Sequence, residues 1–306
     1  MGRARVVVVG AGVTGLSCAV RLLEAGHRVD VLARDLPLET VSAVAGAFWY
    51  PYRALPQERV TAWAREAHGA FAELAGTPGS GVRMLAGTEV HARPAPDPWW
   101  VGAVPGLQRV HPPEGYADAW SLVVPVVDMP VHLRWLVHRV EELGGTLTRM
   151  TLSALPAPED GAVVVNCSAM GARLLAGDRT VVPVRGQVVL VEQFGLDHWW
   201  LEHSDPQRPT YVVPRAEHVV VGGTALEGEW SRTPDPEAAR DILRRAARLV
   251  PQVAEATVVR NVVGLRPVRP EVRVERMGDV VHCYGQGGAG VTISWGCAAE
   301  VVLLLG

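Results

Sequence analysis

The feature that most constrains the fold is a glycine motif, Gly10-Ala-Gly12-Val-Thr-Gly15, directly after a run of valines. The stretch from Arg5 to Val9 has the composition of a buried strand. Apolar residues then recur at helical spacing until Gly26, which suits the end of a helix. Val29 to Ala33 predicts a second strand. The result is a βαβ unit with G-x-G-x-x-G where dinucleotide cofactors bind.

Each glycine of this motif has a physical role. The first makes the turn, the second admits a pyrophosphate, and the third lets helix and strand pack closely. An acidic residue that holds a ribose hydroxyl usually ends the second strand, and here Arg34 precedes Asp35. The arginine fits the 2′-phosphate of NADP, but it can also stack on adenine or pair with a backbone phosphate. A turn that binds nothing is the further alternative.

A second glycine-rich stretch lies near the C-terminal end. An apolar strand, Val280 to Cys283, leads into Gly285-Gln-Gly-Gly-Ala-Gly290, and residues compatible with a helix follow from Gly296. Glycine lets the backbone approach a ligand, and a helix N-terminus presents free N–H groups. The sequence therefore predicts a second ligand-facing loop, preceded in the chain by Arg266 in the segment GLRP.

Between these two loops, segments typical of a parallel nucleotide-binding sheet alternate with segments typical of an antiparallel sheet. Ala43 to Tyr52 runs from small residues to aromatic ones, which suits a pocket against a flat ring or a tight crossing in the core. The other expected elements are helices over 57–74, 128–143 and 235–249, strands over 147–152, 162–166 and 182–191, antiparallel strands within 81–126, and a hairpin over 210–223. This order indicates two interleaved domains.

Composition narrows the class of ligand. The 306 residues carry a net charge of -3, with 29 basic and 32 acidic residues and no basic stripe, so a small molecule is favoured over nucleic acid. Cys18, Cys167, Cys283 and Cys297 stand in apolar surroundings without C-x-x-C spacing, which is typical of buried free thiols. No apolar run reaches the roughly 18 residues of a spanning helix, so we expect a soluble, cytoplasmic protein without a signal peptide.

Taken together, the motifs resemble those of the FAD-dependent D-amino-acid oxidases, with D-aspartate oxidases as close relatives. The matching segments are VVVVGAGVTGLS, LARDLP, AGAFWYPY, VVNCSA, VPVRGQ, TYVVP with the following GGT, GLRPVRP, and YGQGGAGVTISWGCA. They occur in the family's order over nearly the whole chain, and LARDLP matches the bacterial type.

The resemblance implies an α/β fold in which a Rossmann-like FAD-binding domain is interleaved with a mixed-sheet α+β substrate domain. The FAD-binding domain would comprise residues 1–55, 144–185 and 258–306, and the substrate domain residues 56–143 and 186–257. The resemblance favours FAD over NADP as the partner of Arg34, and we expect no metal. The implied cofactor-binding residues are Gly10, Gly12, Val13, Gly15, Arg34, Asp35, Gly46, Ala47, Phe48, Leu152, Gly287, Gly288, Gly290, Val291 and Thr292.

The resemblance also implies how a D-amino acid binds. Arg266 would hold the carboxylate through two parallel charge-assisted hydrogen bonds, Tyr211 would donate to it, and the Gly288 carbonyl would accept from the amine. This clamp would align Cα–H with flavin N5 for hydride transfer, with no side-chain acid or base required. Dioxygen would then give hydrogen peroxide, and the imino acid would hydrolyse to a 2-oxo acid and ammonia.

Four residues are expected to make an apolar side-chain pocket: Phe48, Tyr50, Val213 and Ala225. D-aspartate oxidases tend to have an arginine near the position of Ala225, so a preference for neutral, apolar D-amino acids is predicted. Arg53 and His203 could also reach the pocket, and their charge or polarity would then weaken this preference for apolar side chains.

Other functions remain open on sequence grounds. One is another flavin amine oxidase, such as a glycine or sarcosine oxidase, and another is a D-aspartate oxidase. More distant alternatives are a nicotinamide-dependent dehydrogenase and a nucleotide-binding subunit without catalysis. A homodimer is possible, and no membrane partner is expected.

Overall fold

The computed structural model describes residues 4–157 and 162–306. One end of its large sheet is parallel, in the order β14, β7, β1, β2, β6. Valine-rich segments form the central strands β1 and β7, as the sequence predicts. The strand bounds are β1 (Arg5–Val9), β2 (Arg28–Ala33), β6 (Thr146–Arg149), β7 (Val163–Asn166) and β14 (Val280–Gln286).

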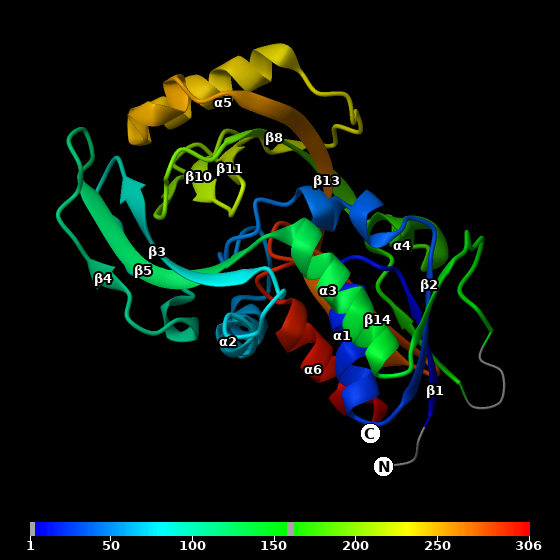
Figure 1. The fold of residues 1–306 in the computed structure, drawn as a ribbon. Helices are drawn as coiled ribbons and strands as arrows, with labels where there is room; N and C mark the ends of the chain where they lie inside the picture. The colour runs from blue at the N-terminus through cyan, green and yellow to red at the C-terminus, as the bar shows by residue number, and fades with distance from the viewer. Residues whose placement is uncertain (1–3, 158–161) are drawn as a thin grey trace.

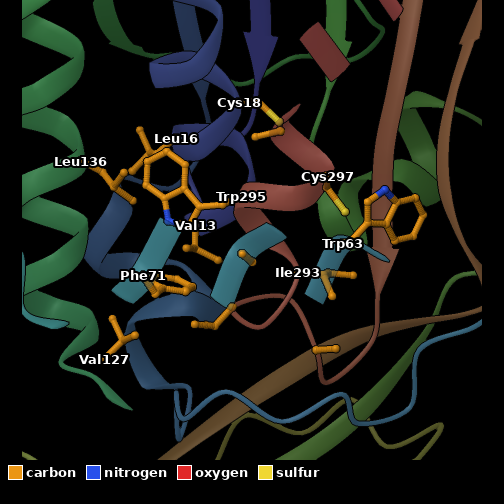
Figure 2. Packing of buried hydrophobic residues seen from close by; sticks show 14 of the residues in the cluster. Val13, Leu16, Cys18, Trp63, Phe71, Val127, Leu136, Ile293, Trp295 and Cys297 are labelled. Carbon is orange, nitrogen blue, oxygen red and sulfur yellow. The ribbon is translucent and has the colours of Figure 1, made fainter. Parts of the chain in front are cut away.

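Three helices pack side by side against this parallel end: α1 (Val13–Glu24), α3 (Met129–Glu142) and α6 (Ser294–Leu305) (Figure 1). The side chains that join them belong to the main core, where Trp295 of α6 lies near Leu16 of α1 and Leu136 of α3 (Figure 2). The helix α2 (Gln57–Leu74) also packs on α6. Glycine is needed at this crossing, because a Cβ on Gly296 would lie 2.2 Å from the carbonyl oxygen of Trp63.

The other end of the sheet is mostly antiparallel, in the order β8, β11, β10, β9, β3, β5, β4. The helix α5 (Pro236–Leu249) covers β8, β10 and β11 (Figure 1). The predicted cap is present, since the Asp235 side chain accepts from the Glu237 N–H at 2.8 Å. The strands are β3 (Val82–His91), β4 (Gln108–Arg109), β5 (Asp118–Val127), β8 (Val182–Glu192), β9 (Trp199–Glu202), β10 (Thr210–Pro214), β11 (His218–Gly222) and β12 (Leu226–Glu227).

A single long strand, β13 (Val258–Met277), joins the two ends (Figure 1). Its first half pairs with β8, and its second half pairs with β14. The register shifts between Val268 and Arg273, where Pro270 interrupts the ladder. The cofactor-type and antiparallel portions therefore meet along one strand, and Arg266 lies on the half that pairs with β8.

Two short segments differ from expectation or were not predicted. The strand expected over 147–152 ends at Arg149; the Met150 N–H still donates to the Ala33 carbonyl of β2 at 2.8 Å, and Met150 to Leu152 line the cavity described below. The helix α4 (Ala172–Leu175) and several single 3₁₀ turns complete the structure; these turns are Pro37–Glu39, Val41–Val44, Val101–Ala103, Ala169–Gly171 and Pro251–Ala254.

All four cysteines are buried and free, as predicted. The sulfur atoms of Cys18, Cys167 and Cys283 lie within 4.8 Å of one another, with 3.9 Å between Cys18 and Cys167. A search of the described residues finds no helix with the length and apolar character needed to cross a membrane.

A buried carboxylate stabilises the region around the register shift. Asp178 accepts hydrogen bonds from Arg269 Nε at 2.9 Å and from the Tyr284 hydroxyl at 3.0 Å, and from the Thr180 backbone at 3.0 Å. Burial alone would raise the pKa of Asp178, but these hydrogen bonds outweigh it and hold the pKa well below its usual range. The ionised carboxylate thus ties α4, β13 and β14 together.

We expect Asp178→Asn to lower the free energy of unfolding by about 2 kcal/mol at neutral pH, because hydrogen bonds to a charged group are lost. The folded-state pKa lies below the unfolded value of about 3.9, so the stabilisation is complete above roughly pH 5 and is lost as the pH falls through the folded pKa. Denaturant unfolding at several pH values checks this. The difference between the two proteins should shrink on acidification, whereas exposed Asp197→Asn should differ little from wild type at any pH.

Candidate functional site

A cavity of about 730 Å³ runs across the junction between the two portions of the sheet. The β1–α1 turn and the end of β2 line it at one side, and β13, β10 and the β14–α6 turn line it at the other. Every predicted cofactor residue contributes to the lining. The two glycine-rich loops expected from the sequence therefore face one common space.

The β1–α1 turn depends on glycine for its shape. Gly10 has a positive φ of 114°, and a Cβ there would lie 2.4 Å from the Cys167 carbonyl oxygen. A Cβ on Gly15 would lie 2.0 Å from the Gly10 carbonyl oxygen, so this position needs the close packing predicted for the third glycine. Gly12 is the N-cap of α1, and the only neighbour that its Cβ would meet is the Ser42 hydroxyl at 3.1 Å. The Val13 N–H donates to Ser42 Oγ at 3.0 Å.

The end of β2 presents paired charges at the rim of the cavity. Arg34 and Asp35 form a bidentate ion pair, with distances of 3.1 Å from Nε to Oδ1 and 2.6 Å from Nη2 to Oδ2. The hydrogen bonds from Arg34 lower the pKa of Asp35. Both side chains are exposed, at 68% and 39%, so they can exchange this pairing for a ligand's hydroxyls or phosphates. Leu152, just past β6, lines the same region.

The segment Gly46 to Tyr50 lines the cavity with all of its residues except Trp49. It is attached to β5, since the Val127 N–H donates to the Ala47 carbonyl at 2.8 Å and Phe48 bridges to Val126. A Cβ on Gly46 would lie 3.0 Å from the Tyr211 ring, so the small residue lets the segment approach β10. Ala47 has a positive φ of 53°, which is unusual for a residue with a side chain.

The β14–α6 turn closes the cavity on the opposite side. Gly287 and Gly288 contact the chain at Tyr52 and Arg53, where added Cβ atoms would lie 2.3 Å or less from existing atoms. Gly290 has open space beside it and lines the cavity, together with Val291. Thr292 also lines it, but its hydroxyl is engaged by the backbone of Tyr50, at 3.0 Å from the N–H and 2.9 Å from the carbonyl. Its contact to a ligand would therefore come from the backbone or the methyl group.

Arg266 and Tyr211 face the same part of the cavity from β13 and β10. The guanidinium donates to the Thr224 carbonyl at 3.0 Å and lies over Gly186, where a Cβ would be 2.3 Å from Nη1. Burial raises the pKa of Tyr211, and the nearby Arg266 acts in the opposite direction. At neutral pH the pair thus offers a fixed cation and a protonated hydroxyl, a combination suited to a carboxylate.

Tyr50 and His203 line the cavity beyond Phe48. Ring centroids are 5.9 Å apart between Phe48 and Tyr50 and 5.6 Å apart between Tyr50 and His203. Both polar side chains contact the buried carboxylate of Glu89, which receives the Tyr50 hydroxyl at 3.0 Å and lies 3.1 Å from His203 Nδ1. This end of the cavity is therefore less apolar than the sequence suggests.

Val213 and Ala225 do not line the cavity, so their predicted place in the pocket wall is wrong. Val213 points to the same face of β10 as Tyr211, but two residues carry it about 7 Å farther along the strand. There it pairs with Val220 and is fully buried in the core. Ala225 is buried in the turn before β12, where its N–H donates to the Gln207 carbonyl at 2.8 Å.

The lining residues that sequence reasoning missed include Ser42, Gly186, Leu201 and Pro209. Gly186 carried a usable signal, because a glycine inside the valine-rich strand VPVRGQVVLV indicates a close approach of another group. Ser42 and the other two gave no local signal. Arg53, which was expected to reach the pocket, does not line it and pairs with Glu227 at 3.5 Å.

The residues present fit FAD. Gly12 stands at the N-terminus of a twelve-residue helix that has no acidic residue in its first turn, which suits a pyrophosphate. Gly12 and Gly290 line the cavity, where an added Cβ would lie 3.1 Å from Ser42 Oγ and 3.9 Å from the Gln286 Cβ, respectively, so a larger side chain at either position would reduce the space for a ligand. The Arg34–Asp35 rim and the Arg266–Tyr211 pair line the same cavity, so a dinucleotide and a second ligand would share one space.

Comparisons with known proteins agree with this geometry. The chain is 47% identical to a D-amino-acid oxidase of Rubrobacter xylanophilus, over 99% of this chain and 96% of the relative. It is 44% identical to a D-amino-acid oxidase of Streptomyces coelicolor and 35% identical to the human D-aspartate oxidase, covering 98% and 100% of this chain and 96% and 95% of those relatives.

Among solved structures, glycine oxidase from Bacillus cereus superposes with a TM-score of 0.82 at 19% identity, over 99% of this chain and 95% of that one. At this identity the likeness shows the fold alone, which is the predicted mixed α/β flavoenzyme fold. The family described as FAD dependent oxidoreductase (DAO) matches residues 5–304. The cofactor and fold predictions are confirmed, and the chain belongs to the family of FAD-dependent oxidoreductases.

Proposed function

We propose that the protein oxidatively deaminates D-amino acids, giving 2-oxo acids, ammonia and hydrogen peroxide. The observation that carries this proposal is the Arg266–Tyr211 pair, which lines the same cavity as Gly288. The bacterial relatives at 47% and 44% identity are named D-amino-acid oxidases, which supports it.

In this proposal the chain's own residues bind and align the substrate. Arg266, held by the Thr224 carbonyl, receives the α-carboxylate through two parallel hydrogen bonds, and Tyr211 donates a third. The Gly288 carbonyl accepts from the amino group. When bound, FAD would supply the redox chemistry, as the acceptor of the hydride from Cα and the donor of electrons to dioxygen.

No side-chain acid or base is assigned to the step, because alignment of Cα–H is the protein's main contribution. Phe48 and Tyr50 exclude water from the side-chain end of the site, and the buried Trp199 packs behind Phe48 with ring centroids 5.5 Å apart. The imino acid product then hydrolyses in water. The proposal includes the remaining expectations: the interleaved FAD-binding and substrate domains with the boundaries given above, a cytoplasmic location, and a possible homodimer.

Steady-state measurement of peroxide release distinguishes this activity from those of glycine, sarcosine, L-amino-acid and D-aspartate oxidases. D-Valine should be turned over and L-valine should not, and D-valine should exceed glycine, sarcosine and D-aspartate in kcat/KM. Faster turnover of glycine or sarcosine would instead favour the type of enzyme named for the Bacillus cereus structure.

Tyr211→Phe should raise the KM for D-valine about tenfold and change kcat less, because a hydrogen bond to a charged ligand is lost while Arg266 remains. Tyr116→Phe, at a half-buried tyrosine outside the cavity lining, is the matched control and should leave both constants unchanged. Equal effects of the two variants would remove Tyr211 from the proposed site.

A further inference from the structure

A buried acid lies behind the wall that the substrate's side chain would meet. Glu89 is fully buried near the C-terminal end of β3, between Trp120 of β5 and Leu201 of β9. A buried carboxylate is costly unless it is paired and hydrogen-bonded. Its Oε1 receives the Tyr50 hydroxyl, while Oε2 has no hydrogen-bond partner among the described residues.

Only imidazoles compensate this charge within 4 Å among the described residues. His203 Nδ1 lies 3.1 Å from Oε1 of Glu89, and His91 Nε2 lies 3.7 Å from it. Burial lowers the pKa of His91, and the attraction of Glu89 does not fully offset it, so this ring is neutral at pH 7. Burial also lowers the pKa of His203, but the contact and charge of Glu89 outweigh burial and raise it. His203 is thus the titrating partner.

Two acidic groups face His203, and both raise its pKa. Glu89 and His91 come from β3, Tyr50 from the segment before α2, and Glu202 from β9. No permanent positive charge neutralises either acid, since neither Glu89 nor Glu202 forms an ion pair with an arginine among the described residues. The Glu89–His203 pair is therefore neutral when His203 is protonated and carries a negative charge when it is not.

We propose that Glu89 is a specificity-determining residue, which acts through His203 to exclude D-amino acids with anionic side chains, and excludes them more strongly once His203 is deprotonated. The inference rests on the proposed D-amino-acid oxidation. With the α-carboxylate on Arg266 and Tyr211, the substrate's side chain would point past Phe48 toward Tyr50 and His203. At neutral pH, where His91 is uncharged, a side-chain carboxylate there meets a net charge that is zero or negative.

The test compares two substrates of equal size, D-asparagine and D-aspartate. The side chain of D-aspartate is ionised above about pH 5 and that of D-asparagine does not titrate, so the ratio of their kcat/KM values reports the charge of the wall. From about pH 5 to about pH 8 this ratio should rise roughly tenfold in favour of D-asparagine as His203 loses its proton. A ratio that stays constant, or that falls, over this range would overturn the inference.

Two variants separate the roles of the pair. Glu89→Gln should lower the ratio about tenfold at neutral pH and move its midpoint to lower pH, because the anion that holds the proton on His203 is gone. His203→Gln should hold the ratio at its upper value at every pH. If Glu89→Gln does not fold, this variant still tests whether titration of His203 causes the pH dependence of the ratio. His198→Gln, at a half-buried histidine outside the cavity lining, should keep the wild-type profile.

D-Valine is measured alongside as the reference for activity. If D-valine is not turned over, the proposed function itself is wrong. If D-valine is turned over but the ratio of kcat/KM for D-asparagine to that for D-aspartate does not change with pH, only the role of Glu89 is wrong. If wild-type turnover of D-aspartate is below detection throughout, Glu89→Gln must bring it into the measurable range, and a variant that does not would contradict the inference.

Discussion

Arg266→Leu should reduce kcat/KM for D-valine about 10³-fold or more, the largest effect expected of any single substitution here. Arg266 lines the cavity from β13 beside Tyr211 of β10, and the leucine would leave the substrate carboxylate without its charged partner. Removal of one member of such a pair costs several kcal/mol, because the remaining charge is desolvated without compensation. The measurement is steady-state kinetics with the FAD content of each preparation determined beforehand.

Arg260→Leu is the matched control, because Arg260 lies on the same strand, is exposed, and does not line the cavity. It should behave as wild type. The flavin content of Arg266→Leu should be close to normal, since the predicted role is in substrate binding. A loss of less than tenfold, or equal losses in the two variants, would move the carboxylate site elsewhere.

Gly12→Val should abolish stoichiometric FAD binding while the protein remains folded. The backbone of Gly12 is extended, with φ at -74°, so valine is tolerated there conformationally. Its side chain would occupy the space in front of the α1 N-terminus, where the pyrophosphate is expected. The dissociation constant for FAD, measured by titration of apoprotein and followed by flavin fluorescence, should rise about 10²-fold or more.

Gly69→Val provides the comparison, since Gly69 is exposed on α2 and a Cβ there has nothing within 4 Å. Its FAD affinity should equal that of wild type. Circular dichroism should show that both variants keep their secondary structure. Unaltered FAD affinity in Gly12→Val would place the pyrophosphate away from the β1–α1 turn.

Much of the fold follows from local patterns in the sequence. The βαβ unit at the N-terminus, the α2 helix and the Asp235-capped α5 helix appear where periodicity and capping predict them. The 20-residue strand β13 could not be predicted, because its prolines argue against a continuous strand. The structure resolves this conflict by changing the partner of the strand from β8 to β14 at the register shift.

The site was predictable to the extent that it is built from backbone. Glycine positions such as Gly12 and Gly288 are fixed by motifs, and both line the cavity. Which side chains form the cavity wall depends on how far each strand runs past the cavity. Because β10 continues past it, Val213 lies in the core and not in the pocket wall. The Glu89–His203 contact joins residues from β3 and the end of β9, so no local pattern could reveal it.

The most direct test of the proposed function is an anaerobic visible spectrum of the purified protein, recorded before and after addition of D-valine and, separately, L-valine. The account predicts oxidised-flavin absorption bands that bleach with the D-isomer, persist with the L-isomer, and return on admission of air. Bands that ignore both isomers, or that bleach with L-valine, would contradict D-amino-acid oxidation. A colourless protein that also fails to take up added FAD would contradict the cofactor assignment as well.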